Sequence, residues 1–165
     1  MTPSTVSFLV ENQPGVLFKV SNLFRRRGFN IDSITVGALE NSGYSRMTIT
    51  VDADARTLHN LIEQLDKMLE VIKVKRLDPL RTVRREMLLV KLETSDPMAR
   101  EDALRYINNQ HGLILDIDDE NIIAEITGEP EELDQFLGYV RGIGIVEMSR
   151  TGVTAIEKGR LMLGE

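Results

Sequence analysis

The hydrophobic positions in the first half of the chain recur at two different spacings. Val6, Phe8 and Val10 fall at every second position of "TVSFLVE", which predicts a strand. Beyond them, apolar residues recur on one face at helical spacing: Val16, Leu17, Val20, Leu23 and Phe24. Three arginines and then Gly28 follow this stripe, and basic residues before a glycine are typical of the end of a helix. The pattern therefore predicts a strand followed by an amphipathic helix.

The spacing then returns to that of strands. Two strand-like segments, "NIDSITVGALE" and "SRMTITVD", flank a predicted turn at residues 41–43. A second helical stripe follows, which contains Leu58, Leu61, Ile62, Leu65 and Leu69. Residues 71–77 alternate again and place Ile72 and Val74 on one face. The first half of the chain thus predicts the order strand, helix, strand, strand, helix, strand.

The second half repeats this order with different residues. "EMLLVKLE" predicts a strand, and Asp96 and Pro97 are suited to the N-cap and the first position of a helix. "HGLILDID" and "NIIAEITG" predict two strands that pair around an acidic turn near Asp119. Pro130 opens another helix, and its apolar face contains Leu133, Phe136, Leu137 and Val140. "GIVEMSR" predicts the last strand, and a tail begins at Thr151.

Two successive βαββαβ patterns predict an α+β protein of two tandem ferredoxin-like units. Each unit should be a four-stranded antiparallel sheet with two helices on one face. A polar joint at residues 77–86 divides the chain into predicted domains of residues 1–79 and 80–165. Because the helices cover only one face of each sheet, the other face must be covered by the second unit, by another copy of the chain or by a partner. We therefore expect the chain to form oligomers.

Composition excludes several classes of protein. The chain has 165 residues, of which 42% are hydrophobic and 28% charged, and its net charge is −6. A nucleic-acid binder needs a basic surface, so the net charge argues against that class. The absence of cysteine excludes disulfides, a thiolate nucleophile and cysteine zinc sites. The N-terminus does not look like a signal peptide, and no apolar run approaches the ~18 residues of a membrane span. We therefore expect a cytoplasmic protein that contacts no nucleic acid and no membrane.

A search for catalytic or metal-binding residues gives none. The two histidines, His59 and His111, lie in different units and have no convergent partners in the sequence. The acidic residues 116–121 do not fit a calcium loop, because Asn121 stands where glycine is required and Thr127 where glutamate is required. "RGIG" lacks the third glycine of a dinucleotide fingerprint. The residues therefore predict no catalytic site, no metal and no cofactor of the chain's own.

The start of the first helix is the best candidate for a binding site. A helix N-terminus presents free backbone N–H groups and the positive end of the helix dipole. Pro14 fixes the backbone, and Gly15 lets an anion approach the N–H groups of residues 15–17. Asn12 and Asn30 each add an amide that can both donate and accept hydrogen bonds. The site suits a small zwitterion such as an amino acid; alternatively, Asn12 and Gly15 only shape a tight strand-to-helix turn.

Several of these segments resemble one protein family. "ENQPGVLFKVSNLFRRRGFNIDSITV" is similar to the opening of an ACT domain, a small-molecule sensor attached to many enzymes of amino-acid metabolism. "RGFNIDSITVG", "SRMTITV", "REMLLVK" and "SRTGVTAIEKG" resemble, in that order, the regulatory small subunit of acetolactate synthase (acetohydroxyacid synthase). The similarity covers nearly the whole chain. It identifies residues 1–79 as the ACT domain and residues 80–165 as the C-terminal ferredoxin-like domain of that subunit.

The resemblance implies a regulatory function in the synthesis of valine, leucine and isoleucine. Small subunits of this family are non-catalytic and bind a large subunit that uses thiamine diphosphate, magnesium and FAD to condense pyruvate with a second 2-oxo acid. They activate the large subunit and confer feedback inhibition by branched-chain amino acids, usually valine. Two other interpretations stay open: a stand-alone ACT-type sensor that regulates another enzyme, and a small enzyme with a dispersed site.

The resemblance also implies which residues bind the effector. ACT domains of the family pair side by side, and the effector binds at the interface of the homodimer. One protomer would contribute Asn12, Gly15, Val16 and Leu17. The facing protomer would contribute Asn30 and Ile31, and the apolar pocket would be lined by Leu9, Val16 and Ile31.

Overall fold

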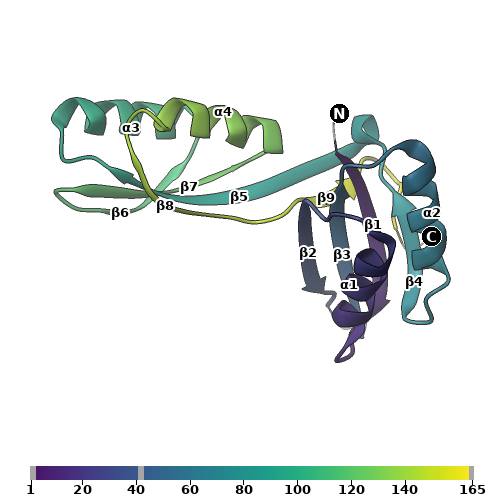
Figure 1. Ribbon diagram of the computed structural model, residues 1–165. Coiled ribbons are helices and arrows are strands. Elements are labelled where there is room, and N and C mark those ends of the chain that lie inside the picture. The colour runs from purple at the N-terminus through teal and green to yellow at the C-terminus, as the bar shows by residue number, and fades with distance from the viewer. Residues whose placement is uncertain (1–2, 41–42, 164–165) are drawn as a thin grey trace. The chain divides into compact units, whose positions relative to one another are not determined.

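The computed structural model describes residues 3–40 and 43–163, which form two compact units (Figure 1). Residues 84–151 form one unit, and the rest of the described chain forms the other. Each unit contains a four-stranded antiparallel sheet with two helices on one face, so the predicted α+β class with two ferredoxin-like units is confirmed. The division by compactness assigns the residues from 152 onward to the first unit, whereas the division of the sequence assigned them to the second domain.

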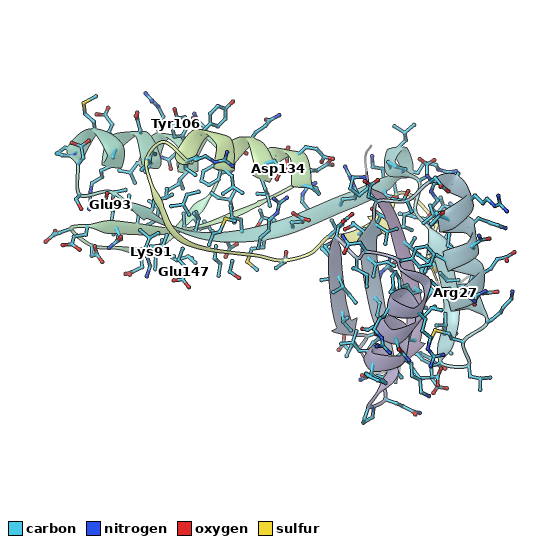
Figure 2. All side chains as sticks on the ribbon, in the orientation of Figure 1. Arg27, Lys91, Glu93, Tyr106, Asp134 and Glu147 are labelled. Atoms are coloured by element: carbon cyan, nitrogen blue, oxygen red, sulfur yellow. The ribbon has the colours of Figure 1, made fainter. Side chains whose placement is uncertain are left out.

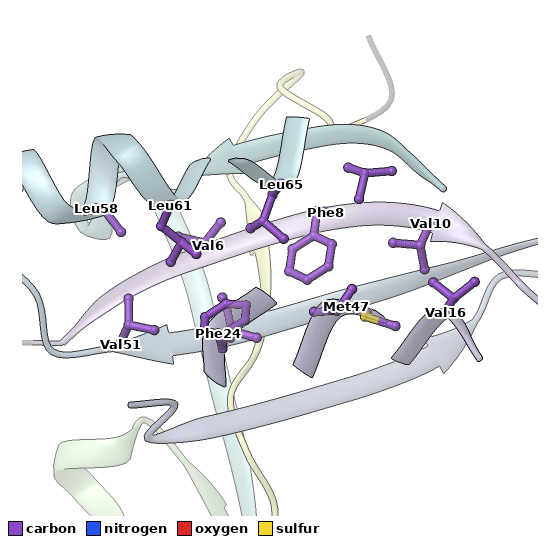
Figure 3. Packing of buried hydrophobic residues seen from close by; sticks show 13 residues of the cluster. Val6, Phe8, Val10, Val16, Phe24, Met47, Val51, Leu58, Leu61 and Leu65 are labelled. Carbon is purple, nitrogen blue, oxygen red and sulfur yellow. The ribbon is translucent and has the colours of Figure 1, made fainter. Parts of the chain in front are cut away.

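The first unit has the predicted order of elements. They are β1 (Ser4–Glu11), α1 (Val16–Arg27), β2 (Ser33–Ala38), β3 (Tyr44–Val51), α2 (Ala55–Asp66) and β4 (Val71–Arg76). The strands lie in the order β2-β3-β1-β4, so β2 is an edge strand. Of the predicted turn at residues 41–43, residues 41 and 42 lie outside the described residues. Figure 3 shows how Phe8, Phe24 and Leu65 meet between the sheet and the helices in a buried core.

In the first unit, the end of α1 and the start of α2 each carry a residue that suits that position. Gly28 ends α1 in the left-handed conformation with φ +69°, as the glycine after three arginines predicts. At the start of α2, the Asp54 carboxylate accepts a hydrogen bond from the N–H of Thr57 at 2.8 Å. These local hydrogen bonds fix the limits of the helices independently of the core.

Two residues assigned to apolar faces from the sequence are exposed instead. Leu69 is 93% exposed because α2 ends at Asp66, before the stripe reaches it. Ile72 is 49% exposed because a bulge shifts the pairing of β4 with β1 at this point. The assignment of both residues to a buried apolar face was therefore wrong. In β4, the buried side chains lie on either side of the bulge.

The far face of the first sheet is polar and is covered by the C-terminal tail. Ser7, Thr48 and Thr50 are buried on this face. Val153 and Ala155 of the tail form a small apolar cluster with Leu77, which follows β4. The cover comes from a segment that the division of the sequence placed in the second domain and that the division by compactness places in the first unit.

The second unit also has the predicted order of elements. They are β5 (Thr82–Glu93), α3 (Pro97–Asn109), β6 (Leu113–Ile117), β7 (Asn121–Gly128), α4 (Pro130–Val140) and β8 (Ile145–Arg150). A short helix, η1 (Pro79–Arg81), precedes β5, and the tail strand β9 (Thr154–Glu157) pairs with β5. The strands of the unit lie in the order β6-β7-β5-β8. Asp96 caps α3 as predicted, since its carboxylate accepts the N–H of Ala99 at 2.9 Å.

One face of the second sheet stays uncovered within the unit. Met87 and Leu89 of β5 point away from the helices and are each 38% exposed. Figure 2 shows Lys91 and Glu147 on this same side of the sheet, opposite the side on which Tyr106 lies. In contrast to the first unit, the second therefore exposes a mixed apolar and charged sheet face.

Candidate functional site

The start of α1 has the backbone geometry that anion binding requires. Gly15 is the N-cap with φ +88° and ψ −10°, a left-handed conformation that glycine adopts readily. No side chain caps this helix, and its first turn contains no acidic residue. The N–H of Val16 bonds weakly to the carbonyl of Gln13 at 3.4 Å, and the described chain supplies no acceptor for the N–H of Leu17. The positive end of the helix is therefore open to an external anion.

The residues around this start combine polar and apolar groups. Asn12 is exposed, and its backbone N–H bonds to the carbonyl of Gly43 at 2.9 Å, which fixes the end of β1. Val16 is buried in the core, whereas Leu17 is 47% exposed. Lys19 pairs with Glu70, and this hydrogen bond lowers the pKa of the Glu70 carboxyl. An amide, free backbone donors and an apolar side chain thus lie next to one another.

Asn30 and Ile31 lie beyond the other end of α1. The helix has twelve residues, so about 18 Å separates its two ends. Asn30 is exposed and donates a long hydrogen bond to Asp32 at 3.4 Å, and Ile31 packs against the core. One chain therefore does not bring Asn30 and Ile31 to the helix start. The six predicted residues can meet only if two copies pair with their α1 helices antiparallel.

The edge of the first sheet adds apolar residues that the sequence did not single out. Ile34 and Val36 point to the helix side of β2 but are exposed, because β2 is an edge strand that α1 does not cover. Their alternation within β2 was visible in the sequence, but the position of β2 in the sheet was not. Leu9, in contrast, was wrongly expected to line a pocket with Val16, since it pairs with Arg46 on the opposite face of the sheet.

The remaining candidates from the sequence form no reaction centre. His59 is exposed and lies 3.3 Å from Glu63 in the next turn of α2, and His111 lies in a turn with φ +53°. Among the residues that the structure describes, no group of three or more His, Asp or Glu side chains could hold a metal ion. A hollow of about 210 Å³ on the open face of the second sheet is lined by Leu89, Ile123 and other residues, without a nucleophile beside a base. No helix in the described ranges is long and apolar enough to cross a membrane.

Comparison with known proteins identifies both halves of the chain. Residues 6–73 match the family described as "AHAS small subunit-like ACT domain", and residues 85–159 match "Small subunit of acetolactate synthase". The probable acetolactate synthase small subunit of Methanothermobacter thermautotrophicus is 44% identical over 161 residues, which are 96% of each chain. The acetolactate synthase small subunit of Mycolicibacterium smegmatis is 38% identical over 99% of this chain and 96% of its own.

A solved structure agrees with these matches. The crystal structure of the acetolactate synthase small subunit from Thermotoga maritima superposes with a TM-score of 0.88 at 38% identity, and the match covers 98% of this chain and 100% of that one. The similarity thus includes the order of elements, the sheets and the tail as well as the sequence. The chain therefore belongs to the acetolactate synthase small-subunit family, with an ACT domain in its first half.

Proposed function

We propose that the chain activates the large, catalytic subunit of acetolactate synthase and makes it sensitive to inhibition by valine. Family membership implies a catalytic large-subunit partner. Thiamine diphosphate, magnesium and FAD would belong to that partner, and valine would be the only small molecule that this chain binds. The chain would regulate branched-chain amino-acid synthesis without performing chemistry.

The uncapped start of α1 is the observation that carries the proposal for the effector. The carboxylate of valine would accept hydrogen bonds from the free N–H groups beside Gly15. The ammonium group would be bound by the side-chain oxygen of Asn12 or of Asn30. The isopropyl group would contact Leu17 and the apolar residues of the edge strand β2.

The proposed site needs a homodimer. Two chains that pair side by side with antiparallel α1 helices would place Asn30 and Ile31 of one protomer at the Gly15 turn of the other. The exposed Ile34 and Val36 would be buried by the same pairing. A dimer would thus both cover the apolar edge and complete two identical sites.

The substitution Gly15→Asp tests the site directly. A Cβ at Gly15 would meet no atom within 4 Å, so the side chain fits the single chain. Its carboxylate would lie beside that of valine, and two like charges about 4 Å apart repel by about 1 kcal/mol in water and about 4 kcal/mol at an effective dielectric constant near 20. Since about 1.4 kcal/mol corresponds to a tenfold change in affinity, we expect the half-inhibiting valine concentration to rise at least about fivefold.

Two control variants separate charge from backbone strain. Gly15→Ala introduces a side chain at φ +88° without a charge, and Gly159→Asp introduces the same charge at a glycine with φ +74° and no neighbour within 4 Å. Turnover of pyruvate by the large subunit is measured with each variant, with and without valine. All variants should still activate the large subunit. If the complex with Gly15→Asp is as sensitive to valine as the wild-type complex, the helix start only forms a tight turn and is not the effector site.

A further inference from the structure

The tail of the chain crosses the polar face of the first sheet. Figure 1 shows it in yellow, returning to the first unit after β8. Val153 contacts β2 at one edge of the sheet, and Glu157 forms an ion pair with Lys75 of β4 at the other edge, with N–O distance 2.7 Å. These contacts lie on the first and the last of the four strands, three strand spacings or about 14 Å apart, which is also the length of about four extended residues. The tail therefore crosses all four strands in extended conformation.

The contacts of the tail are made mainly through its backbone. The hydroxyl of Thr35 donates to the carbonyl of Val153, and the N–H of Val153 donates to the hydroxyl of Ser33 at 3.4 Å. Further along, the guanidinium of Arg46 donates to the carbonyl of Ala155 at 2.7 Å. Burial lowers the pKa of Arg46, although the charge of the nearby Glu157 acts in the opposite direction. Side chains of β2 and β3 thus bind the backbone of the tail, in addition to the pairing of β9 with β5.

Gly152 brings the tail into direct contact with the backbone of β2. A Cβ built on Gly152 would lie 3.0 Å from the carbonyl oxygen of Ile34 and 3.1 Å from the Cβ of Ser33. Distances this short leave no room for a side chain unless β2 or the tail moves. The glycine therefore permits a close approach that a larger residue would widen by a few tenths of an ångström.

The residue before Gly152 is fixed just as firmly in the second unit. The N–H of Thr151 donates to the carbonyl of Met87 at 2.9 Å, and the N–H of Met87 donates to the hydroxyl of Thr151, also at 2.9 Å. Two residues later, Val153 is bonded to β2 of the first unit. The chain therefore passes from the hydrogen bonds of one unit to those of the other within three residues.

β2 also adjoins one part of the proposed effector site, Asn30 and Ile31. It begins at Ser33, two residues after Ile31, and as an edge strand it has a backbone neighbour, β3, on one side only. A small movement of β2 is therefore resisted by β3 on one side only and by the contacts of the tail. Whatever moves Asn30 and Ile31 should move Ser33 and, through it, the tail.

We infer that residues 152–157 form a strap that couples the effector site to the second unit, with Ser33, Thr35 and Gly152 as positioning residues. This inference rests on the proposed function, since it assumes that valine binds beside β2. Valine at the dimer interface would shift β2, the hydroxyls of Ser33 and Thr35 would carry the shift to Val153, and Thr151 would transmit it to β5. The strap would therefore be required for the response to valine but not for its binding.

The variants Thr35→Val and Gly152→Ala test the strap in the full chain. Thr35→Val removes the hydrogen bond to Val153 but keeps the shape and the preference for a strand. Thr35→Ser keeps the hydroxyl and should behave as wild type. For Thr35→Val and Gly152→Ala we expect valine to bind within about threefold of the wild-type affinity in a calorimetric titration. The half-inhibiting valine concentration of the complex with the large subunit should rise about tenfold, within the usual range of allosteric coupling.

Matched controls on the same sheet face show whether the tail is responsible. Thr48→Val removes a hydroxyl that bonds within the sheet, to Ser7 at 3.2 Å, and not to the tail. Gly37→Ala adds a methyl group to β2 where no atom lies within 4 Å. Both controls should retain wild-type inhibition. If Thr35→Val and Gly152→Ala also retain it, the strap inference is wrong; if their binding and inhibition fall in parallel, the strap belongs to the binding site and does not couple it.

Hydrogen exchange of the wild-type chain gives an answer that does not depend on folding of the variants. Valine should slow amide exchange in residues 152–157 although none of them belongs to the proposed site. Slowing confined to the segments around Gly15 and Asn30 would overturn the strap and leave the proposed function intact. A wild-type chain that binds no valine in calorimetry would instead overturn the proposed function, and the strap with it.

Discussion

Asp118 shows how a single side chain defines a turn in this protein. Its carboxylate accepts the backbone N–H groups of Glu120 and Asn121, both at 2.7 Å. These hydrogen bonds, the one from Glu120 first, lower the pKa of Asp118 below its ordinary value. The acidic segment between β6 and β7 is thus a turn that Asp118 stabilises by accepting hydrogen bonds from the backbone, which explains why an aspartate stands at this position.

The lowered pKa of Asp118 predicts a defined dependence of stability on pH. A carboxyl group with a lower pKa in the folded state stabilises the fold above the unfolded value, about 4, and loses this contribution as pH falls through the folded pKa. We expect Asp118→Ala to lower the urea midpoint at pH 6 and to have a progressively smaller effect as pH falls below about 4. Asp119→Ala, which removes the neighbouring carboxylate, should show no such difference at pH 6. A wild-type advantage over Asp118→Ala that grows toward low pH would contradict this account.

At the scale of elements, the sequence predicted correctly those features that depend only on neighbouring residues. The helix limits at Gly28 and Asp96 follow from residues within one turn, so the sequence predicted both. The bulge at Ile72 depends on the register between β4 and β1, which no pattern within β4 contains. The end of α2 before Leu69 likewise depends on how the chain must turn to enter β4.

In the candidate site, too, the sequence predicted local features but not contacts between distant residues. The turn at Gly15 could be predicted because Pro-Gly before an apolar stripe is a local signal. The hydrogen bond between Thr35 and Val153 joins residues 118 positions apart, and nothing near either residue indicates it. The face on which Leu9 lies was also missed, because every residue of a short apolar strand is a candidate until the sheet is known.

Substitutions can test whether α2 ends before Leu69 and leaves this residue outside the core. Leu65 is fully buried, so Leu65→Ala should reduce the free energy of unfolding by about 2–5 kcal/mol. Leu69 is almost fully exposed, so Leu69→Ala should change it by less than about 0.5 kcal/mol. Urea denaturation followed by circular dichroism measures both values. Equal losses for the two variants would show that Leu69 belongs to the core after all.

At the scale of the whole molecule, the exposed apolar surfaces predict assembly. Met87 and Leu89 on the second sheet, and Ile34 and Val36 at the edge of the first, are large apolar side chains open to solvent. Monomeric proteins rarely expose several such groups together. We expect a dimer or larger species at micromolar concentration in sedimentation equilibrium. A folded monomer at that concentration would contradict both this prediction and the two-chain effector site.

The path of the tail also determines the order in which the protein can be completed during synthesis. The first unit leaves the ribosome first, but Val153 and Ala155, which cover its polar sheet face, emerge only after the whole second unit. At typical rates of translation this delay is roughly 4–16 seconds. Throughout that time the ACT domain lacks its cover while the second unit can already fold. A nascent chain should therefore complete its ACT domain only once residues 152–157 have emerged, and a truncation that removes them should damage the domain farthest from them in sequence.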